Sequence, residues 1–321
     1  MKKRISLLLV LLMLFSLLAG CGTETSVIDN DVSAPIKIAA LNGPTGVGLA
    51  PLMDDERFDV TVYQAPDEIT GKIITGDADI AAVPSNLASV LYNKTEGQIQ
   101  ILSTVTMGVL YLVQNQTGGD AIKSFADLDG KTVIASGKGG VPEYVMQKLT
   151  EENDIDVNIE WLGNHTDVVT KMKTAEAGTV ALLPEPMVTI LTSGAADKYT
   201  VLDVNAMWKD VTGEELPMGV LVAQKKFIEE RADDLTIFME NASRASKTVN
   251  EAGDDTLNLL VEKGFFKSAA IAQTAIPNCN IVFYADDGDI AGLQTLFNIL
   301  FEMNPKALGG KLPDEGIFYQ K

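Results

Sequence analysis

The fold is decided by the stretch Ile36-Lys37-Ile38-Ala39-Ala40-Leu41-Asn42-Gly43-Pro44-Thr45-Gly46-Val47-Gly48-Leu49-Ala50. It predicts a short apolar strand, then an abrupt turn rich in Gly and Pro, then the start of a helix. Glycine permits backbone conformations that other residues avoid, and it lets a ligand approach the main chain. The free N–H groups in the first turn of the following helix would then point at that ligand. One such turn is weak evidence, and its weight comes from recurrence along the chain.

Similar breaks follow other apolar strands, at residues 84–86, 136–143, 163–167 and 184–186. At the first of these, Ser85 is expected to cap a helix over 87–93. At 163–167, Asn164 or Thr166 is the expected cap. Because strands and helices alternate and the breaks fall on the same side, the sequence predicts an α/β fold with a parallel-rich sheet. In such sheets ligands bind beyond the carboxyl ends of the strands.

The remaining elements follow from periodicity and from Gly and Pro punctuation. Strands are predicted at 59–63, 77–83, 99–105, 108–114, 132–135, 158–162, 179–183, 218–224 and 281–284. Helices are predicted from Pro66 to near Gly76 and at 87–93, 187–193, 256–263, 269–275 and 290–303. An apolar stripe with helical spacing predicts one more helix, over Leu235 to Val249.

Composition excludes several classes of function. The chain has 321 residues, enough for two domains, and 46% of them are hydrophobic, as in a globular protein. Its net charge of −19 argues against nucleic acid as a partner and against docking onto an anionic membrane by charge alone. The single histidine, His165, excludes a His-based metal cage. The break at 136–143 lacks the Gly-Lys-Ser/Thr order of a phosphate-binding P-loop, and Asp77 and Asp79 are interpreted as turn formers.

The N-terminus indicates export. A basic Lys2-Lys3-Arg4 precedes an apolar run, Ile5–Leu18, that is shorter than the roughly 20 residues a membrane-spanning helix needs. The run ends in Leu18-Ala19-Gly20-Cys21, which resembles the lipobox of bacterial lipoproteins. That resemblance implies a signal peptide over 1–20, cleavage before Cys21, and lipidation of Cys21, including palmitate.

Two consequences follow from this N-terminus. We expect the mature protein at the extracytoplasmic face of a bacterial cell membrane, held by its acyl chains, with residues 21–34 as a flexible polar tether. With Cys21 lipidated, Cys279 has no disulfide partner, and we expect it to be a small buried residue.

Together with the lipobox and the breaks, three segments resemble a known family: 76–81, 124–133 and 220–227. The chain is similar, over about residues 35–305, to solute-binding lipoproteins of ABC importers, in the nitrate/sulfonate/taurine and thiamine-pyrimidine-precursor group. The resemblance implies a type II periplasmic-binding-protein-like fold with two hinged lobes. Lobe 1 would comprise 35–114 and 225–321, and lobe 2 would comprise 115–224, with hinge crossings near 112–118 and 216–224.

In this family the ligand contacts come from loops at the breaks. By that resemblance, the candidate ligand-binding residues are Asn42, Gly43, Thr45, Gly46, Ser85, Asn86, Lys138, Gly139, Gly140, His165 and Glu185. Ser85 and Asn86 have the alternative role of capping a helix, and His165 that of a surface or capping residue. Glu185, between two prolines, is a rigidly held loop carboxylate suited to a donor on the ligand.

The ligand class follows from the arginines. Proteins that bind sulfonate, nitrate or dicarboxylate need cationic groups held in fixed directions, and the planar guanidinium of arginine suits this role. Beyond the signal peptide the chain has only Arg57, Arg231 and Arg244, none of them at a strand-end break. The hypothesis is therefore a neutral or weakly basic, hydrogen-bonding ligand such as a pyrimidine or another flat heterocycle. Lys138 and helix N-termini leave open an anion of the sulfonate or nitrate type.

The predicted function is capture of this small molecule and its delivery to an ABC permease and its ATPase, by a monomer without catalytic residues, cofactor or metal. One alternative is a lipoprotein that senses the same ligand and feeds a receptor. The other is an enzyme of the thiamine-precursor or menaquinone type. The pyrimidine-forming relatives use a cysteine cluster for iron, which one usable cysteine cannot supply, and the lipobox contradicts the intracellular location of both enzyme groups.

Overall fold

The computed structural model describes residues 31–116, 120–285 and 290–320. The described residues from Val32 onward belong to one compact unit, Val32–Lys321. The predictions about the signal peptide, Cys21 and most of the tether therefore lie outside the described residues. Within the described ranges, no helix is both long enough and apolar enough to cross a membrane.

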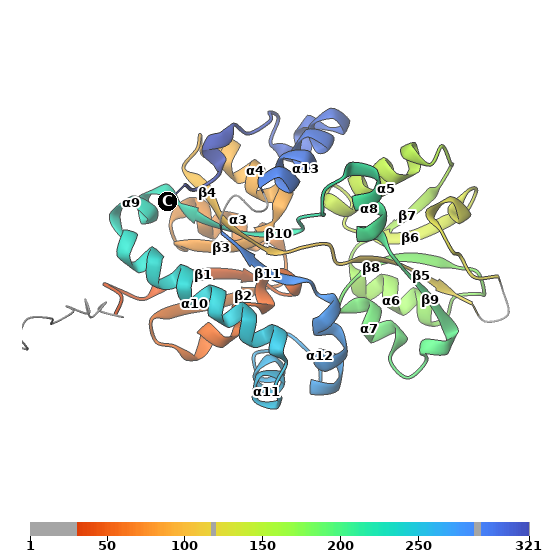
Figure 1. The fold of residues 1–321 in the computed structure, drawn as a ribbon, viewed down its shortest axis with the longest axis horizontal. Coiled ribbons are helices and arrows are strands. Elements are labelled where there is room, and N and C mark those ends of the chain that lie inside the picture. Colours follow the sequence, from red (N-terminus) through yellow and green to blue (C-terminus); the bar gives the residue numbers. More distant parts are fainter. Residues whose placement is uncertain (1–30, 117–119, 286–289, 321) are drawn as a thin grey trace, which may run out of the picture. The chain divides into compact units, whose positions relative to one another are not determined.

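The unit Val32–Lys321 contains two β-sheets (Figure 1). The six-stranded sheet has the order β11-β4-β10-β3-β1-β2. Its strands are β1 (Ile36–Leu41), β2 (Phe58–Tyr63), β3 (Ile80–Pro84), β4 (Ile99–Thr106), β10 (Gly219–Gln224) and β11 (Ile281–Tyr284). The five-stranded sheet has the order β7-β6-β8-β5-β9. Its strands are β5 (Leu110–Asn115), β6 (Thr132–Ser136), β7 (Asn158–Leu162), β8 (Val180–Pro184) and β9 (Tyr199–Asp203).

Most strands of each sheet run in one direction. β1 pairs in parallel with β2 and β3, and β4 runs the same way as β3 because both are antiparallel to β10 between them. β6 pairs in parallel with β7 and β8, and β9 runs the same way as β8 because both are antiparallel to β5. The prediction of a parallel-rich α/β fold is confirmed.

The helices follow the strands closely, as expected from the alternation in the sequence. The α-helices are α2 (Pro44–Val47), α3 (Pro66–Thr75), α4 (Ser85–Lys94), α5 (Val141–Glu152), α6 (His165–Lys173), α7 (Met187–Thr192), α8 (Val204–Thr212), α9 (Lys225–Glu230), α10 (Ala232–Glu251), α11 (Asp254–Glu262), α12 (Ala269–Ala275) and α13 (Ile290–Met303). Short 3₁₀ turns are η1 (Ala50–Asp54), η2 (Phe125–Leu128), η3 (Ala196–Lys198), η4 (Ile276–Asn278), η6 (Pro305–Leu308) and η7 (Glu315–Ile317).

Helices cover both faces of each sheet, and this burial forms the core. Alternate residues of β1 point to opposite faces, so that Ile36 and Ile38 pack with α10 whereas Ala39 joins the cluster formed with α3, α4 and α13. The predicted stripe on α10 is buried, including Phe238. The five-stranded sheet packs against α6 and α7 on one face and against α5 and α8 on the other, where Trp208 is fully buried.

The chain passes between the sheets at two places. It leaves the six-stranded sheet after β4, through Met107–Val109, and β5 pairs with β8 and β9 of the other sheet. β5 thus belongs to the five-stranded sheet although it falls within the range 35–114 expected for lobe 1. The chain returns through residues 213–218 to β10, near the crossing expected at 216–224.

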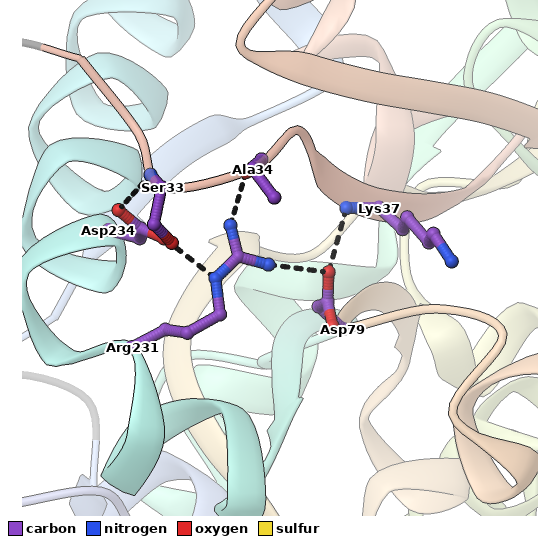
Figure 2. A network of polar contacts seen from close by, with 6 residues as sticks. All are labelled: Ser33, Ala34, Lys37, Asp79, Arg231 and Asp234. Carbon is purple, nitrogen blue, oxygen red and sulfur yellow. Dashed lines mark hydrogen bonds and ion pairs between the residues drawn. The ribbon is translucent and has the colours of Figure 1, made fainter.

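The first described residues are fixed at the amino end of β1 by a polar network (Figure 2). The Ser33 backbone N–H and hydroxyl both donate to the Asp234 carboxylate, at 3.0 and 2.5 Å. The Arg231 guanidinium binds Asp234 at 2.6 Å and Asp79 at 3.4 Å, and it also donates to the Ala34 carbonyl. One arginine on the α9–α10 turn therefore holds both the entering chain and β3.

The two carboxylates before β3, interpreted from the sequence as turn formers, make contacts with neighbouring elements. Asp79 accepts from the Lys37 backbone N–H at 3.0 Å and donates its own N–H to the Lys37 carbonyl at 2.9 Å, which joins the amino ends of β1 and β3. Asp77 forms an exposed ion pair with Lys72 at 3.3 Å. Both lie at the end of the sheet opposite to the strand-end breaks.

Candidate functional site

The strand-end breaks of both sheets meet at one cavity of about 640 Å³. It is lined by the turns that follow β1, β2 and β3 and by those that follow β6, β7 and β8. Nine of the eleven predicted ligand-binding residues line it: Asn42, Gly43, Thr45, Asn86, Lys138, Gly139, Gly140, His165 and Glu185. Gly46 and Ser85 do not.

The break after β1 is a tight turn around Gly43, whose φ of 113° favours glycine. Asn42 donates its side-chain N–H to Gln64 at 3.0 Å, which joins this turn to the one after β2. The sequence predicts the start of a helix here, with free N–H groups that would face a ligand. The helix that follows, α2, has only four residues. Gly46 is buried against β1, where a Cβ would lie 2.2 Å from the Leu41 carbonyl oxygen. Its role in the structure is close packing.

The break after β3 differs from the prediction at Ser85. Ser85 is the first residue of α4 instead of its cap, and the N-cap is Pro84, which makes no side-chain bond. The Ser85 hydroxyl is fully buried and donates to the Pro217 carbonyl at 2.9 Å, so it fixes the segment that returns to β10. The next residue, Asn86, lines the cavity.

The glycine-rich break after β6 places a cation at the cavity. Gly137 and Gly139 have positive φ values of 89° and 83°, and the Gly139 N–H donates to the Glu143 carboxylate at 2.6 Å. Gly140 is the N-cap of the twelve-residue helix α5. Lys138 is exposed, and within the described residues it is the only lysine or arginine that lines the cavity.

The break after β7 carries His165, the first residue of α6. Asn164 is the N-cap, and its side chain accepts from the Asp167 N–H at 2.9 Å, as predicted. His165 Nδ1 lies 2.5 Å from the hydroxyl of Ser136, a cavity-lining residue at the end of β6. Burial lowers the pKa of His165. Ser136 was not among the predicted site residues, although it begins one of the predicted breaks.

The break after β8 buries a carboxylate. Glu185 is only 3% exposed, and it is joined to Pro186 by a cis peptide bond. Its two carboxylate oxygens accept from the backbone N–H and the hydroxyl of Thr189, at 3.1 and 3.0 Å. Burial raises the pKa of Glu185, and the two Thr189 bonds oppose that shift. Among the described residues no cation pairs with it.

Two further titratable groups lie close to Glu185. Burial raises the pKa of the Tyr111 hydroxyl, and the negative charges of Asp203 and Glu185 raise it further. Burial likewise raises the pKa of the Cys279 thiol, with a smaller effect of Glu185. Cys279 is a fully buried free thiol, so its predicted role as a small core residue is confirmed. A thiol with a raised pKa carries little thiolate and is a poor nucleophile.

Within the described residues, no group of three or more His, Cys, Asp or Glu side chains is arranged to hold a metal ion. The polar groups that the cavity offers are the Lys138 ammonium, the His165 imidazole, the Glu185 carboxylate, and the amides and hydroxyls of the turns. These groups can hydrogen-bond and orient a small molecule.

Several solved structures share this fold at low sequence identity. An ABC transporter protein from Parabacteroides distasonis has a TM-score of 0.76 and 20% identity, with 90% of this chain and 99% of that chain covered. The periplasmic aliphatic sulphonate binding protein SsuA from Escherichia coli has a TM-score of 0.68 and 14% identity, with 89% and 92% covered. The CA3427 gene product of Candida albicans, described as having the generic periplasmic binding protein fold, has a TM-score of 0.54 and 14% identity, with 88% and 93% covered.

Comparison with curated protein sequences finds no match. A family model described as NMT1/THI5 like matches residues 54–254, which is more than half of the chain and includes the breaks after β3, β6, β7 and β8. The two-sheet α/β architecture is that of periplasmic binding proteins. The chain is therefore a member of the NMT1/THI5-like family.

Proposed function

We propose that this protein is the extracytoplasmic solute-binding subunit of an ABC importer. It captures a small neutral or weakly basic, heterocyclic ligand between two lobes and delivers it unaltered to a membrane permease. The observation that carries the proposal is the single cavity at which the strand-end breaks of both sheets meet. The position of this cavity agrees with the general rule that ligands of open α/β sheets bind beyond the carboxyl ends of the strands.

The buried carboxylate supports a ligand with an N–H donor. A charged group removed from water is costly unless it is paired and hydrogen-bonded. Glu185 is 3% exposed and lines the cavity, and its bonds to Thr189 use only one donor for each oxygen. An amine or amino-substituted ring placed here would supply the missing donor. Because burial raises its pKa, the carboxylate can also share a proton with a weakly basic ligand.

The positions of the arginines support a ligand that is not strongly anionic. Arg57 binds Asp55 at 2.6 Å, Arg231 belongs to the network at the amino end of β1, and Arg244 is exposed on α10. Of the described residues that line the cavity, none is arginine. The described residues that line the cavity therefore offer no guanidinium group to bind a sulfonate or carboxylate through two parallel hydrogen bonds.

A sulfonate is the second candidate, and Lys138 favours it. This lysine lines the cavity beside Gly139 and the N-cap of α5. Lysine can bind an anion as a point charge. The Escherichia coli neighbour is named for binding aliphatic sulphonates. The two candidates differ in the cavity group that contacts the ligand, which is Glu185 for an amine and Lys138 for a sulfonate.

The membrane attachment and the partners are part of the proposal. Lipidation of Cys21 would hold the protein at the outer face of the cell membrane, where a permease and its ATPase could receive the ligand. A Cys21→Ala variant should appear in the soluble fraction, and labelled palmitate should be incorporated only by the parent protein. A sensing role would use the same cavity and would be indicated by ligand-dependent signalling without uptake.

A thermal-shift screen tests the ligand. Probes are 4-amino-5-hydroxymethyl-2-methylpyrimidine for the heterocycle and taurine for the sulfonate. A probe at a hundred times its dissociation constant should stabilise the fold by about 2.7 kcal/mol. We expect the pyrimidine to stabilise the parent and to lose that effect in Glu185→Gln, while the exposed Glu240→Gln keeps it. Stabilisation by taurine that is lost in Lys138→Gln and kept in Glu185→Gln would reverse the assignment.

A further inference from the structure

We infer that Ser136 is a positioning residue that holds His165 as the neutral Nε2–H tautomer, so that the cavity presents a fixed N–H donor. The tautomer is a property of the free protein. Its use by a ligand rests on the proposed function.

The topology brings the two residues together. β6 and β7 are parallel neighbours, and Ser136 at the end of β6 is in register with Leu162 at the end of β7. The chain turns after Leu162 and begins α6 at His165, so the two breaks lie side by side. Ser136 is 2% exposed, and its hydroxyl lies 2.5 Å from His165 Nδ1.

The hydrogen of the Ser136 hydroxyl sets the direction of this bond. A neutral imidazole has one nitrogen that donates and one that accepts, and the bond made by one nitrogen decides where the proton sits on the other. His165 is the only side-chain partner of Ser136 among the described residues. If Nδ1 donated to Ser136, the buried hydroxyl hydrogen would have no acceptor among the described residues. The hydroxyl therefore donates to Nδ1, and Nε2 carries the proton.

The surroundings favour the neutral ring. His165 is the first residue of the nine-residue helix α6, whose amino end carries partial positive charge and disfavours an imidazolium. Burial acts in the same direction. The charged side chains that line the same cavity are Lys138, Glu185 and Asp67, and Asp167 lies on α6 itself. Among the described residues, none of these carboxylates forms an ion pair with His165.

This arrangement constrains the ligand. β7, β6 and β8 are consecutive in the sheet. The His165 donor, Ser136 and the Glu185 acceptor therefore follow one another along the row formed by the carboxyl ends of these strands. A ligand that satisfies both outer groups carries a hydrogen-bond acceptor, such as a ring nitrogen or a carbonyl oxygen, together with an N–H donor. A molecule with acceptors alone leaves the Glu185 carboxylate with only its two bonds from Thr189.

The chain contains one histidine, so the tautomer can be read without assigning any other ring. The protein is prepared with ¹⁵N-labelled histidine and without a histidine tag, and long-range ¹⁵N–¹H correlation spectra are recorded at pH 7 without ligand. We expect one protonated nitrogen, at Nε2. In Ser136→Ala the preference for Nε2–H should fall, while Ser193→Ala should give the parent spectrum, because Ser193 is exposed and its side chain bonds to none of the described residues.

The outcomes separate this inference from the proposed function. A parent spectrum with the proton on Nδ1, or a doubly protonated ring, would overturn the inference whether or not the variants fold. So would a Ser136→Ala spectrum equal to the parent spectrum. A ligand arm then adds 4-amino-5-hydroxymethyl-2-methylpyrimidine, which should shift the His165 Nε2 signal and bind about fivefold more weakly to Ser136→Ala, as expected for one hydrogen bond. If the probe fails to bind, the ligand proposal fails and the tautomer result stands.

Discussion

The Tyr144 hydroxyl on α5 accepts a hydrogen bond, 2.9 Å long, from the side-chain amide of Asn304, at the end of α13. α5 packs with the five-stranded sheet and α13 with the six-stranded sheet, so this bond joins the elements that cover the two sheets. Tyr144 is 4% exposed, and its ring contributes to the core whether or not the hydroxyl is present.

Removal of that hydroxyl should weaken the contact between α5 and the end of α13 without leaving a cavity in the core. We expect Tyr144→Phe to lower the free energy of unfolding by about 1 kcal/mol, the usual net value of one hydrogen bond. It should also raise the radius of gyration of the ligand-free protein in solution scattering, because one contact across the sheets is lost. Tyr284→Phe, at an exposed tyrosine, is the control. An unchanged radius in Tyr144→Phe would mean that other contacts hold the two sheets.

The buried Glu185 should make stability depend on pH. Burial raises its pKa, so the folded protein binds the proton more tightly than the unfolded chain. The resulting stabilisation is complete below the unfolded pKa and is lost as pH rises through the folded pKa. Glu185→Gln cannot ionise, so its stability relative to the parent should rise as pH increases from the unfolded pKa of glutamate, about 4.3, through the folded pKa of Glu185, by about 1.4 kcal/mol for each tenfold difference in proton affinity. Urea unfolding across this range measures it.

The control for this pH dependence is Glu240→Gln, at an exposed glutamate. Its difference from the parent should stay flat over the same pH range. If the Glu185→Gln difference is equally flat, Glu185 ionises in the folded protein as easily as in the unfolded chain.

Two glycines close in the sequence should respond in opposite ways to alanine. At Gly46 a Cβ would lie 2.2 Å from the backbone oxygen of Leu41, so Gly46→Ala must shift the first break and should cost about 1–3 kcal/mol or more. At Gly71, inside α3, a Cβ meets nothing within 4 Å. Gly71→Ala should therefore stabilise the helix by up to about 1 kcal/mol. Equal thermal unfolding of the two variants would contradict the packing at Gly46.

The network at the amino end of β1 depends on the shape of the Arg231 guanidinium. Lysine keeps the charge but cannot donate in fixed directions to Asp79, Asp234 and the Ala34 carbonyl at once. Arg231→Lys should speed hydrogen exchange of the Ser33 amide by at least about tenfold, since charged hydrogen bonds contribute about 1.5–3 kcal/mol. Arg244→Lys, on the exposed side of α10, should leave that rate unchanged. Equal rates in both variants would show that Asp234 alone holds Ser33.

The sequence predicted the local order of the fold because glycine and proline mark where strands end. Pro66 begins α3 and Gly76 ends it in the left-handed conformation, and α13 has the predicted bounds. Pairing between distant strands is not written in such local signals. β5 is apolar in either sheet, and its partners β8 and β9 lie more than sixty residues further along the chain. No prediction was made for β9 or α8, over Tyr199–Thr212.

The same contrast between local sequence signals and distant contacts holds for the candidate site. The resemblance selected turns that line one cavity, because breaks at the carboxyl ends of parallel strands lie at the same end of a sheet. Within a turn, the direction of a side chain depends on neighbours far away in sequence. Ser85 was expected to cap a helix but donates to Pro217, 132 residues later. Ser136 begins a predicted break, but nothing local in the sequence indicates its bond to His165. Which of these residues touch a ligand remains a prediction.

β1 is held by Arg231 and Asp234 near one end and reaches the cavity at Asn42 near the other, about 20 Å away for six extended residues. A pulling force on the chain before Ser33 would therefore act at the end of β1 opposite to the cavity, and the network would transmit it to α10 and β3. A tether of another length or composition could be attached there without changing the residues that line the cavity. The same attachment point would suit a fluorescent or surface-immobilised version of the protein, since the added group would be joined at the end of β1 opposite to the cavity.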